Sequence, residues 1–294
     1  MENRATRLEG RCDRSEVHVR LLRLFASPSY HPPVLPQVAL QIAQLAHRPT
    51  VTFDDVAALL EQDPILAAKV LSLAQSALYA PRSPIRTLRQ AVVRLGLKTL
   101  RDVVLEASVT LRVFRVPGYD TAMERLARHS SVTAHLMRAL CRRSSLEAEH
   151  AFLCGLLHDV GIAACLLALC DDPRAGTVPF EALGGVIEEV HEEASGVVTR
   201  LWNLPAEIQR VVASHHGLGG GSAPDPVNAL LVVAEHLAGE VGAAASGPGD
   251  RSGAPAAPPG LFEAACGALR LDLATVAAAR DEAAEIMGKL ASAA

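Results

Sequence analysis

The sequence is poor in aromatic residues, which make up 3% of its 294 positions and include one tryptophan and three tyrosines. A hydrophobic core must therefore be built mainly from Leu, Val, Ile and Ala, within a hydrophobic fraction of 50%. No long segment alternates Val, Ile or Thr with polar residues, the pattern that is typical of half-buried strands. Because Ala and Leu are strong helix formers, the composition predicts an all-α protein.

The signatures of several common enzyme and cofactor classes are missing. The six cysteines form no C-x-x-C pair, and no G-x-S-x-G, Walker A or G-x-G-x-x-G motif occurs. The N-terminus has no apolar signal stretch, so we expect reduced cysteines and a cytoplasmic location. A net charge of -4 is too small to argue for a nucleic-acid partner.

One apolar segment, residues 151–170, is long enough to resemble a membrane span. His158 and Asp159 lie together near its middle, where ionisable groups are costly in lipid. No basic residues flank its start, which follows Glu147 and Glu149. We interpret the segment as a buried helix that carries a polar site, and we expect no membrane partner.

Helix start signals are clear in residues 16–118, which we predict to form an N-terminal bundle of short helices. Thr52 with Asp55 has the pattern of a capping box. Asp63 followed by Pro64 is typical of an N-cap and a first helical position. Tight turns are therefore expected between these helices.

Longer helical periodicities in residues 119–241 predict a second bundle. Its expected helices cover about residues 121–143, 147–170, 180–203, 205–216 and 226–240. Residues 242–260 are rich in Gly, Ala, Pro and Ser and are predicted to be a disordered linker. Residues 1–15 are expected to be a loose tail, and residues 261–294 a C-terminal helical segment docked on the body.

Histidines recur on the apolar faces of the predicted helices in the second half. These are His129, His158, His191 and His215, and Asp159 adjoins the second of them. A single histidine on such a face is usually a core residue bonded to a backbone carbonyl. Four of them packed together would bury several polar nitrogens without partners unless they shared a ligand. A divalent Fe, Mn, Zn or Co ion would supply one, since imidazole nitrogen and carboxylate oxygen suit these metals.

The ordered pattern H…HD…H…HH…E at positions 129, 158–159, 191, 215–216 and 235 resembles the HD superfamily of metal-dependent phosphohydrolases. Within that superfamily the chain resembles the HDOD branch over about residues 20–240. The segments that carry the resemblance are Leu35-Pro36, Asp63-Pro64-Ile-Leu-Ala-Ala-Lys-Val-Leu71, Ser76-Ala77-Leu-Tyr79, Leu88-Arg-Gln-Ala-Val-Val-Arg-Leu-Gly96, Gly155-Leu-Leu-His-Asp-Val-Gly161, His191-Glu-Glu-Ala-Ser-Gly196 and Leu201-Trp-Asn-Leu-Pro205. The resemblance implies two packed helical bundles, an HDOD subdomain and an HD-like bundle, followed by a C-terminal helix.

The resemblance also implies a set of metal ligands. The expected ligands are His129, His158, Asp159, His191, His215 and Glu235, with His216, His236 and Glu192 as alternative or supporting groups. In an enzyme, Asp159 would be the catalytic residue. The chain departs from the family pattern twice, because Glu235 stands where aspartate is usual and Gln75 where asparagine is usual.

Two functions follow from the resemblance. The first is a stand-alone bacterial regulatory protein that binds a signalling protein or a small nucleotide-like ligand, with a metal in the HD-like half. The alternative is a metal-dependent phosphohydrolase acting on a phosphoester or nucleotide. The segment after His216 lacks the GYP motif of cyclic-di-GMP phosphodiesterases, which disfavours that substrate.

A third possibility is nucleic-acid binding through the basic segment 82–115, which has a helix–Gly–helix pattern. The residues expected on a phosphate-binding surface are Arg86, Arg89, Arg94, Lys98 and Arg101. Solvated basic faces are common without a ligand, so this alternative is not favoured.

Overall fold

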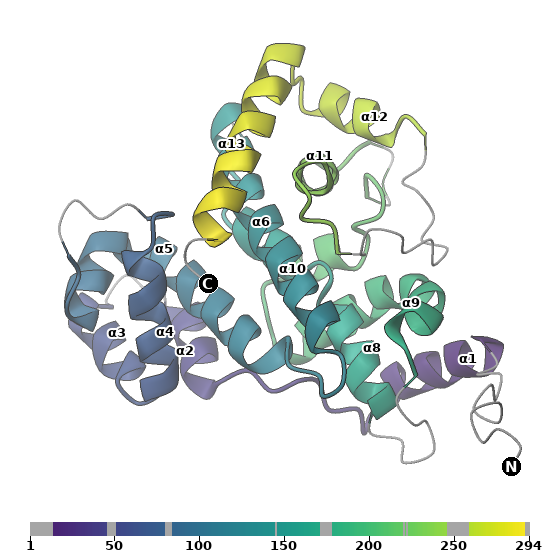
Figure 1. The fold of residues 1–294 in the computed structure, drawn as a ribbon, viewed down its shortest axis with the longest axis horizontal. Helices are drawn as coiled ribbons and strands as arrows, with labels where there is room; N and C mark the ends of the chain where they lie inside the picture. The colour runs from purple at the N-terminus through teal and green to yellow at the C-terminus, as the bar shows by residue number, and fades with distance from the viewer. Residues whose placement is uncertain are drawn as a thin grey trace, which may run out of the picture.

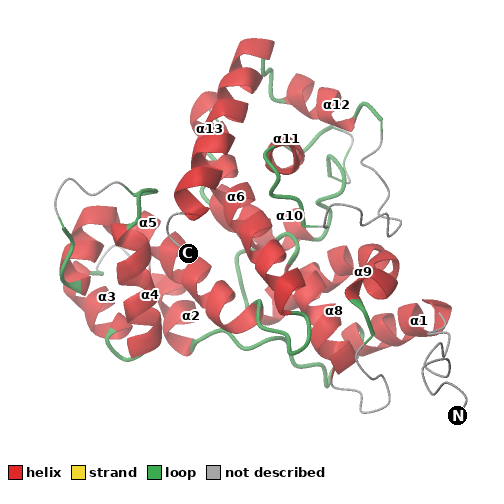
Figure 2. Cartoon of the chain, in the orientation of Figure 1, coloured by secondary structure: helices red, strands yellow, loops and turns green. Residues whose placement is uncertain are grey.

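The computed structural model describes residues 14–45, 51–79, 84–144, 146–170, 178–219, 221, 223–245 and 259–291. Every regular element in these ranges is helical (Figure 2). The prediction of an all-α fold is confirmed. Residues 1–13, which contain most of the predicted tail, and residues 246–258 of the predicted linker lie outside the described residues.

The first half contains short helices at the places that the capping signals indicate. They are α1 (Arg14–Phe25), α2 (Gln37–Leu45), α3 (Phe53–Leu60), α4 (Pro64–Gln75), α5 (Leu88–Ser108) and the π-helix η2 (Val109–Val113). Thr52 and Asp55 form the predicted capping box at the start of α3. The Asp63 side chain caps α4 by accepting a hydrogen bond from the Leu66 amide. Gly96 has a φ of 71° and interrupts the helical backbone within α5, at the glycine of the helix–Gly–helix pattern in residues 82–115.

Helix α1 does not join the bundle of α2 to α5, although the predicted N-terminal bundle begins at residue 16. It packs against α8 and α9 of the second half (Figure 1). Arg14 donates to the Gly185 carbonyl and pairs with Glu189, both on α9. Further along, the Trp202 indole donates to the Pro33 carbonyl. The polypeptide between α1 and α2 therefore runs along the second half before the small bundle begins.

The second half contains longer helices, with two corrections to the predicted boundaries. The helices are α6 (Asp120–Ser144), α7 (Ala151–Leu157), α8 (Val160–Cys170), α9 (Phe180–Leu201), α10 (Ala206–Val212) and α11 (Pro226–Glu240). The predicted helix over residues 147–170 is two helices, α7 and α8, with a turn at His158 and Asp159. The predicted helix over residues 205–216 ends at Val212, so His215 and His216 lie in a turn.

The apolar segment 151–170 is the one stretch in the described chain with the length and composition of a membrane span, and its apolar window is 94% buried inside the protein. It packs against α6 and α9. Its hydrophobicity is accounted for by the protein core.

The C-terminal helices α12 (Leu261–Ala268) and α13 (Leu273–Ala291) dock as the sequence predicts, α12 against α11 and α13 against α6. The first residues of the predicted disordered linker are ordered. Ala243 is 2% exposed and lies against the second bundle. The rest of the predicted linker, residues 246–258, lies outside the described residues.

A buried ion network joins the two halves. Arg101 and Asp102 on α5 are 1% and 2% exposed and pair with each other, and Arg138 on α6 donates to the same carboxylate at 2.7 Å. Arg101 also donates to the Glu149 carbonyl just before α7. Buried charges need such partners, so this network constrains the position of α5 on α6 and α7.

Candidate metal centre

The turn between α7 and α8 places His158 and Asp159 in one polar cluster. In a continuous helix, the side chains of two adjacent residues such as His158 and Asp159 would point about 100° apart. Here the Ser195 hydroxyl on α9 donates to the His158 carbonyl at 2.6 Å and accepts from the Gly161 amide at 2.9 Å. These bonds from a neighbouring helix satisfy backbone groups where the helical pattern is interrupted.

The glycines around the HD pair permit close approach of the surrounding helices. A Cβ atom on Gly161 would lie 2.0 Å from the His191 carbonyl oxygen, and one on Gly155 would lie 2.8 Å from the Cα of Ala134. Only glycine therefore allows α8 to meet α9, and α7 to meet α6, at these distances. The G-L-L-H-D-V-G motif is thus a packing requirement as well as a chemical one.

Asp159 lies between two pairs of histidines. Its Oδ2 is 3.5 Å from His129 Nε2 and 3.2 Å from His158 Nε2. Its Oδ1 is 3.3 Å from both His191 Nε2 and His215 Nε2. All five residues are at most 6% exposed, so the cluster is sheltered from water. The sequence-predicted histidines from four separate segments therefore do meet around the predicted carboxylate.

Backbone carbonyl groups determine which nitrogen of each imidazole faces the centre. The four acceptors of the Nδ1 atoms are Ala243 O for His129 at 2.8 Å, Gly155 O for His158 at 2.8 Å, Glu188 O for His191 at 3.0 Å and Val212 O for His215 at 2.8 Å. A carbonyl oxygen only accepts, so each Nδ1 carries the hydrogen. In every neutral imidazole the Nε2 lone pair therefore points inward.

This arrangement fits a divalent metal. The Nε2 atoms face each other in pairs, His129 with His158 at 3.0 Å and His191 with His215 at 3.2 Å. Two inward lone pairs at such distances repel unless a proton or a metal cation lies between or beside them. Nδ1 bonded to a carbonyl with Nε2 free for the ion is the usual state of a metal-binding histidine. The donor set of imidazole nitrogens and carboxylate oxygens suits Fe, Mn, Zn or Co.

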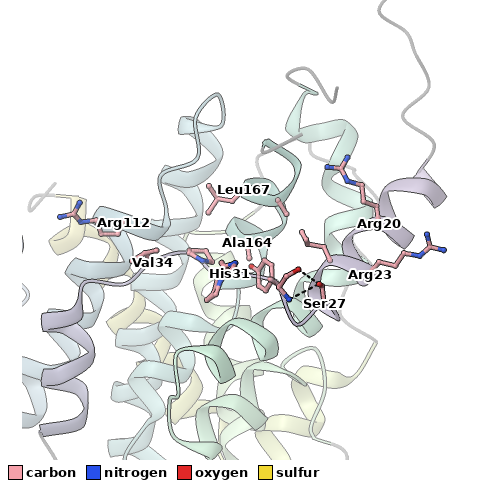
Figure 3. Close-up of a pocket in the computed structure, with 14 residues that line it drawn as sticks. Arg20, Arg23, Ser27, His31, Val34, Arg112, Ala164 and Leu167 are labelled. Carbon is pink, nitrogen blue, oxygen red and sulfur yellow. Dashed lines mark hydrogen bonds between the residues drawn. The ribbon is translucent and has the colours of Figure 1, made fainter. Parts of the chain in front are cut away.

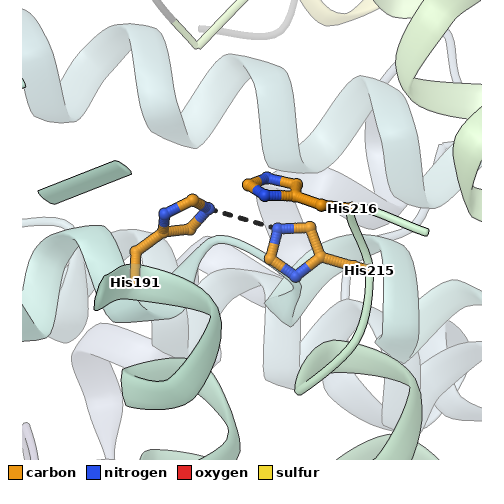
Figure 4. Close-up of side chains that lie close together, drawn as sticks. All are labelled: His191, His215 and His216. Carbon is orange, nitrogen blue, oxygen red and sulfur yellow. Dashed lines mark hydrogen bonds between the residues drawn. The ribbon is translucent and has the colours of Figure 1, made fainter. Parts of the chain in front are cut away.

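The structure divides the remaining predicted ligands into two groups. Glu235 reaches the cluster, with its Oε1 3.1 Å from His158 Nε2, so its extra methylene relative to aspartate is accommodated. The ring of His216, predicted as an alternative or supporting group, lies 4.7 Å from that of His191 and 4.3 Å from that of His215 (Figure 4).

Two predicted alternative ligands have other roles. Glu192 accepts a hydrogen bond from the His216 amide at 2.9 Å and so supports the turn. His236 stacks on Phe262 of α12 at 4.0 Å and is 3.6 Å from Glu240. The structure places the His236 side chain outside the cluster, because neighbours on a helix face different sides and Glu235 takes the inward one.

The nearby carboxylates influence which imidazoles of the cluster are protonated. Burial disfavours a charged imidazole, but Asp159 raises the pKa of His158 well above its usual range and raises that of His191 to about 9. Burial would raise the pKa of Asp159, yet the surrounding imidazoles hold it well below its usual range. Burial lowers the pKa of His129, and burial together with His215 lowers that of His216 to about 4. Protons are therefore favoured on His158 and His191, two of the residues where metal ions would bind.

Three residues that contribute to the site were not predicted from the sequence. The Ala243 carbonyl orients His129 from within the predicted linker. Ser195 bonds to the HD turn, and Glu188 lies on the wall of the site, 3.6 Å from His216. A backbone acceptor can be any residue type, so only the tertiary structure reveals Ala243. Glu188 and Ser195 lie one helical turn on either side of His191, which places them near it.

A cavity of about 210 Å³ opens onto the cluster. It is lined by Ala122, Leu126, His129, Asp159, Ile162, Phe180, Gly184, Ile187, Glu188, His191, His216, Glu235, Gly239, Ala244 and Ala245. Ala244 and Ala245 lie a few residues after the end of α11, so the start of the predicted linker closes one side of the site.

A larger groove of about 870 Å³ lies away from the cluster, between α1, η2 and the outer face of α8. Figure 3 shows Arg20 and Arg23 at one end, Arg112 at the other, and Ala164 and Leu167 of α8 between them. Its described lining contains no acidic residue. Its size and basic ends make it a second place where an anion could bind.

The basic segment does not form the predicted surface as a whole. Arg86, Arg94 and Lys98 are exposed, and Arg89 pairs with Asp54. Arg101 is 1% exposed within the ion network described above. Its assignment to a phosphate-binding surface is therefore wrong, because its charge is used inside the fold.

Residues 32–218 match the model of the HDOD domain family, and the chain belongs to that family. An uncharacterized protein of Treponema pallidum is 26% identical over 196 residues, which cover 63% of this chain and 38% of that protein. The chain thus spans well under half of that curated relative.

Solved structures share the fold. An HDOD domain protein of unknown function from Geobacter sulfurreducens is 24% identical, with a TM-score of 0.64 over 94% of this chain and 99% of that one. A candidate metal-dependent phosphohydrolase from Shewanella amazonensis SB2B is 20% identical, with a TM-score of 0.65 over 91% and 99%. A candidate signal transduction protein from Marinobacter aquaeolei VT8 is 22% identical, with a TM-score of 0.60 over 95% and 65%. At these identities the likeness concerns the fold alone.

Proposed function

We propose that this HDOD protein binds two divalent metal ions and hydrolyses a phosphoester. The observation that supports this most is the position of Asp159, whose two oxygens face separate histidine pairs with inward Nε2 atoms. A carboxylate that bridges two ions is a feature of two-metal hydrolases. The complete ligand set favours this function over the purely regulatory role that the family resemblance suggests first.

The residues divide into two ligand groups that share one carboxylate. His129, His158 and Glu235 would hold one ion with Asp159 Oδ2, and His191 and His215 the other with Asp159 Oδ1. Such ions supply a water of lowered pKa and neutralise charge on the phosphoryl group. The chain contributes the orientation of the imidazoles through their carbonyl partners, and apolar walls that limit bulk water.

Because the two ligand groups are separate, each substitution is expected to change the metal content in a different way. Metal content, measured by mass spectrometry after reconstitution, is expected to be two ions per chain in the native protein, one in His129→Ala and in His191→Ala, and none in Asp159→Asn. Hydrolysis of p-nitrophenyl phosphate is expected to fall at least 100-fold in each variant, about the contribution of a catalytic metal. Thermal unfolding by circular dichroism checks that each variant folds.

Two results would count against the proposal. Full metal content in Asp159→Asn would show that the ions bind elsewhere. Two bound ions without hydrolysis of any phosphoester would leave a metal-binding regulatory protein instead.

The groove between α1 and η2 favours a second function, regulation by a bound anionic ligand. Its volume lies within the roughly 300–1,000 Å³ of small-molecule sites, and its ends carry Arg20, Arg23 and Arg112. Nucleotide binding there is testable with AMP on Asp159→Asn, in which the metal centre cannot contribute. Arg23→Glu should weaken binding at least tenfold and Arg128→Glu, on the exposed side of α6, should not. Equal effects of the two substitutions on AMP binding would exclude the groove as the nucleotide-binding site.

A further inference from the structure

The walls of the metal-centre cavity restrict what can enter it. Apart from its titratable residues, the described lining consists of apolar side chains and glycines, contributed by α6, α8, α9, α11 and residues 244–245. It contains no serine, threonine, asparagine or glutamine and no lysine or arginine. A ligand that fills this space therefore meets mainly hydrocarbon, and its polar neighbours among the lining side chains are the metal ligands, His216 and Glu188.

The charges on these walls are unsuited to a polyphosphate. Asp159, Glu188 and Glu235 are acidic, and the cations that line the larger groove have no counterpart here. Two bound ions would offset the charge of one phosphoryl group at the ligand atoms. A second phosphate would face the partly buried Glu188 without a positive partner, and this like-charge contact would weaken binding.

The volume and polarity are equally unsuited to a nucleoside. About 210 Å³ is smaller than the roughly 300–1,000 Å³ of pockets for drug-sized ligands. Ribose hydroxyls and base edges would lose their water contacts and find no side-chain hydroxyl or amide to replace them. Groups that are buried without partners reduce affinity more strongly than missing contacts do.

We propose that the metal centre takes a single phosphoryl group esterified to a small apolar alcohol, and that its cavity excludes nucleotides. This rests on the proposed metal-dependent function of the same site. The apolar side chains of Leu126, Ile162 and Phe180 would contact the alcohol, and Glu188 would reject additional negative charge. Nucleotide-like ligands, if the protein binds any, belong to the groove at α1 and η2.

The test is a binding experiment on the metal-reconstituted full chain. Isothermal titration calorimetry with inorganic phosphate, ethyl phosphate, AMP and ADP is compared with the same titrations of Asp159→Asn, and only metal-dependent binding is counted. Phosphate and ethyl phosphate are expected to bind with similar affinity, AMP at least tenfold more weakly, and ADP not measurably. Glu188→Lys is expected to make ADP binding measurable, whereas Glu193→Lys, on the exposed side of the same helix, should not.

The outcomes separate this inference from the function on which it rests. Metal-dependent binding of AMP or ADP as tight as that of ethyl phosphate would overturn the exclusion of nucleotides and leave the hydrolase proposal intact. If phosphate, ethyl phosphate and AMP all fail to bind to a protein that holds two ions, the hydrolase proposal itself would be refuted. An equal effect of Glu188→Lys and Glu193→Lys would refute the role of Glu188.

Discussion

Substitution of Gly161 by alanine would be unusually disruptive for the addition of one methyl group. The new Cβ would lie 2.0 Å from the His191 carbonyl oxygen and 2.7 Å from the Ser195 amide nitrogen, both of them backbone atoms on α9. Because backbone cannot rotate away, α8 and α9 must separate by about 1 Å in a close-packed core. Overpacking of this kind costs typically about 1–3 kcal/mol, and we expect the upper end of that range.

The expected consequence is a melting temperature lowered by about 6 °C or more, at roughly 2–4 °C per kcal/mol for chains near this size. Metal content should fall as well, because the displaced segment carries His191. Gly288→Ala is the matched control, since Gly288 is exposed in α13 and its Cβ would meet nothing within 4 Å. That change should stabilise the protein by about 0.5–1 kcal/mol, as alanine does in a helix. Equal melting temperatures for the two variants would refute the close-approach argument.

Three further outcomes are expected. The pKa of His191, raised to about 9, means that its protonated form stabilises the metal-free protein fully below about pH 6.5 and that this contribution is lost as the pH rises through 9. In His129→Ala, which is expected to keep only the ion at His191 and His215, metal competes with that proton, so affinity measured against a chelator should rise roughly tenfold per pH unit from 7 to 9 and then level off; a flat profile would contradict it. Arg101→Met should cost about 3–5 kcal/mol in urea unfolding, because Asp102 loses a buried partner; a cost below 1 kcal/mol would show that Arg138 suffices. Thr52→Ala should cost about 1 kcal/mol through loss of the α3 cap, and no change in the unfolding midpoint would argue against the capping box.

Local signals in the sequence were sufficient for most helix starts and for the ligand histidines. Capping residues act within four positions of themselves, so Thr52 and Asp63 predicted the starts of α3 and α4 without tertiary information. The break between α7 and α8 was not predictable in the same way. Its backbone groups bond to Ser195, which lies more than 30 residues away, and the apolar pattern is continuous across it.

The residue order alone determined that this chain is all-α, that it belongs with HDOD proteins, and that four histidines and Asp159 are inward-facing. These properties follow from propensity, periodicity and motif, all of which are written in consecutive residues. The tertiary structure decided that Asp159 faces both histidine pairs, that Glu235 and not His236 reaches them, and that Arg101 is used inside the fold. It also decided that Ala243 orients His129 and that the cavity walls are apolar. Such properties depend on which distant segments meet. A backbone carbonyl acceptor or an apolar cavity wall requires no particular motif in the local sequence, so it cannot be recognised there.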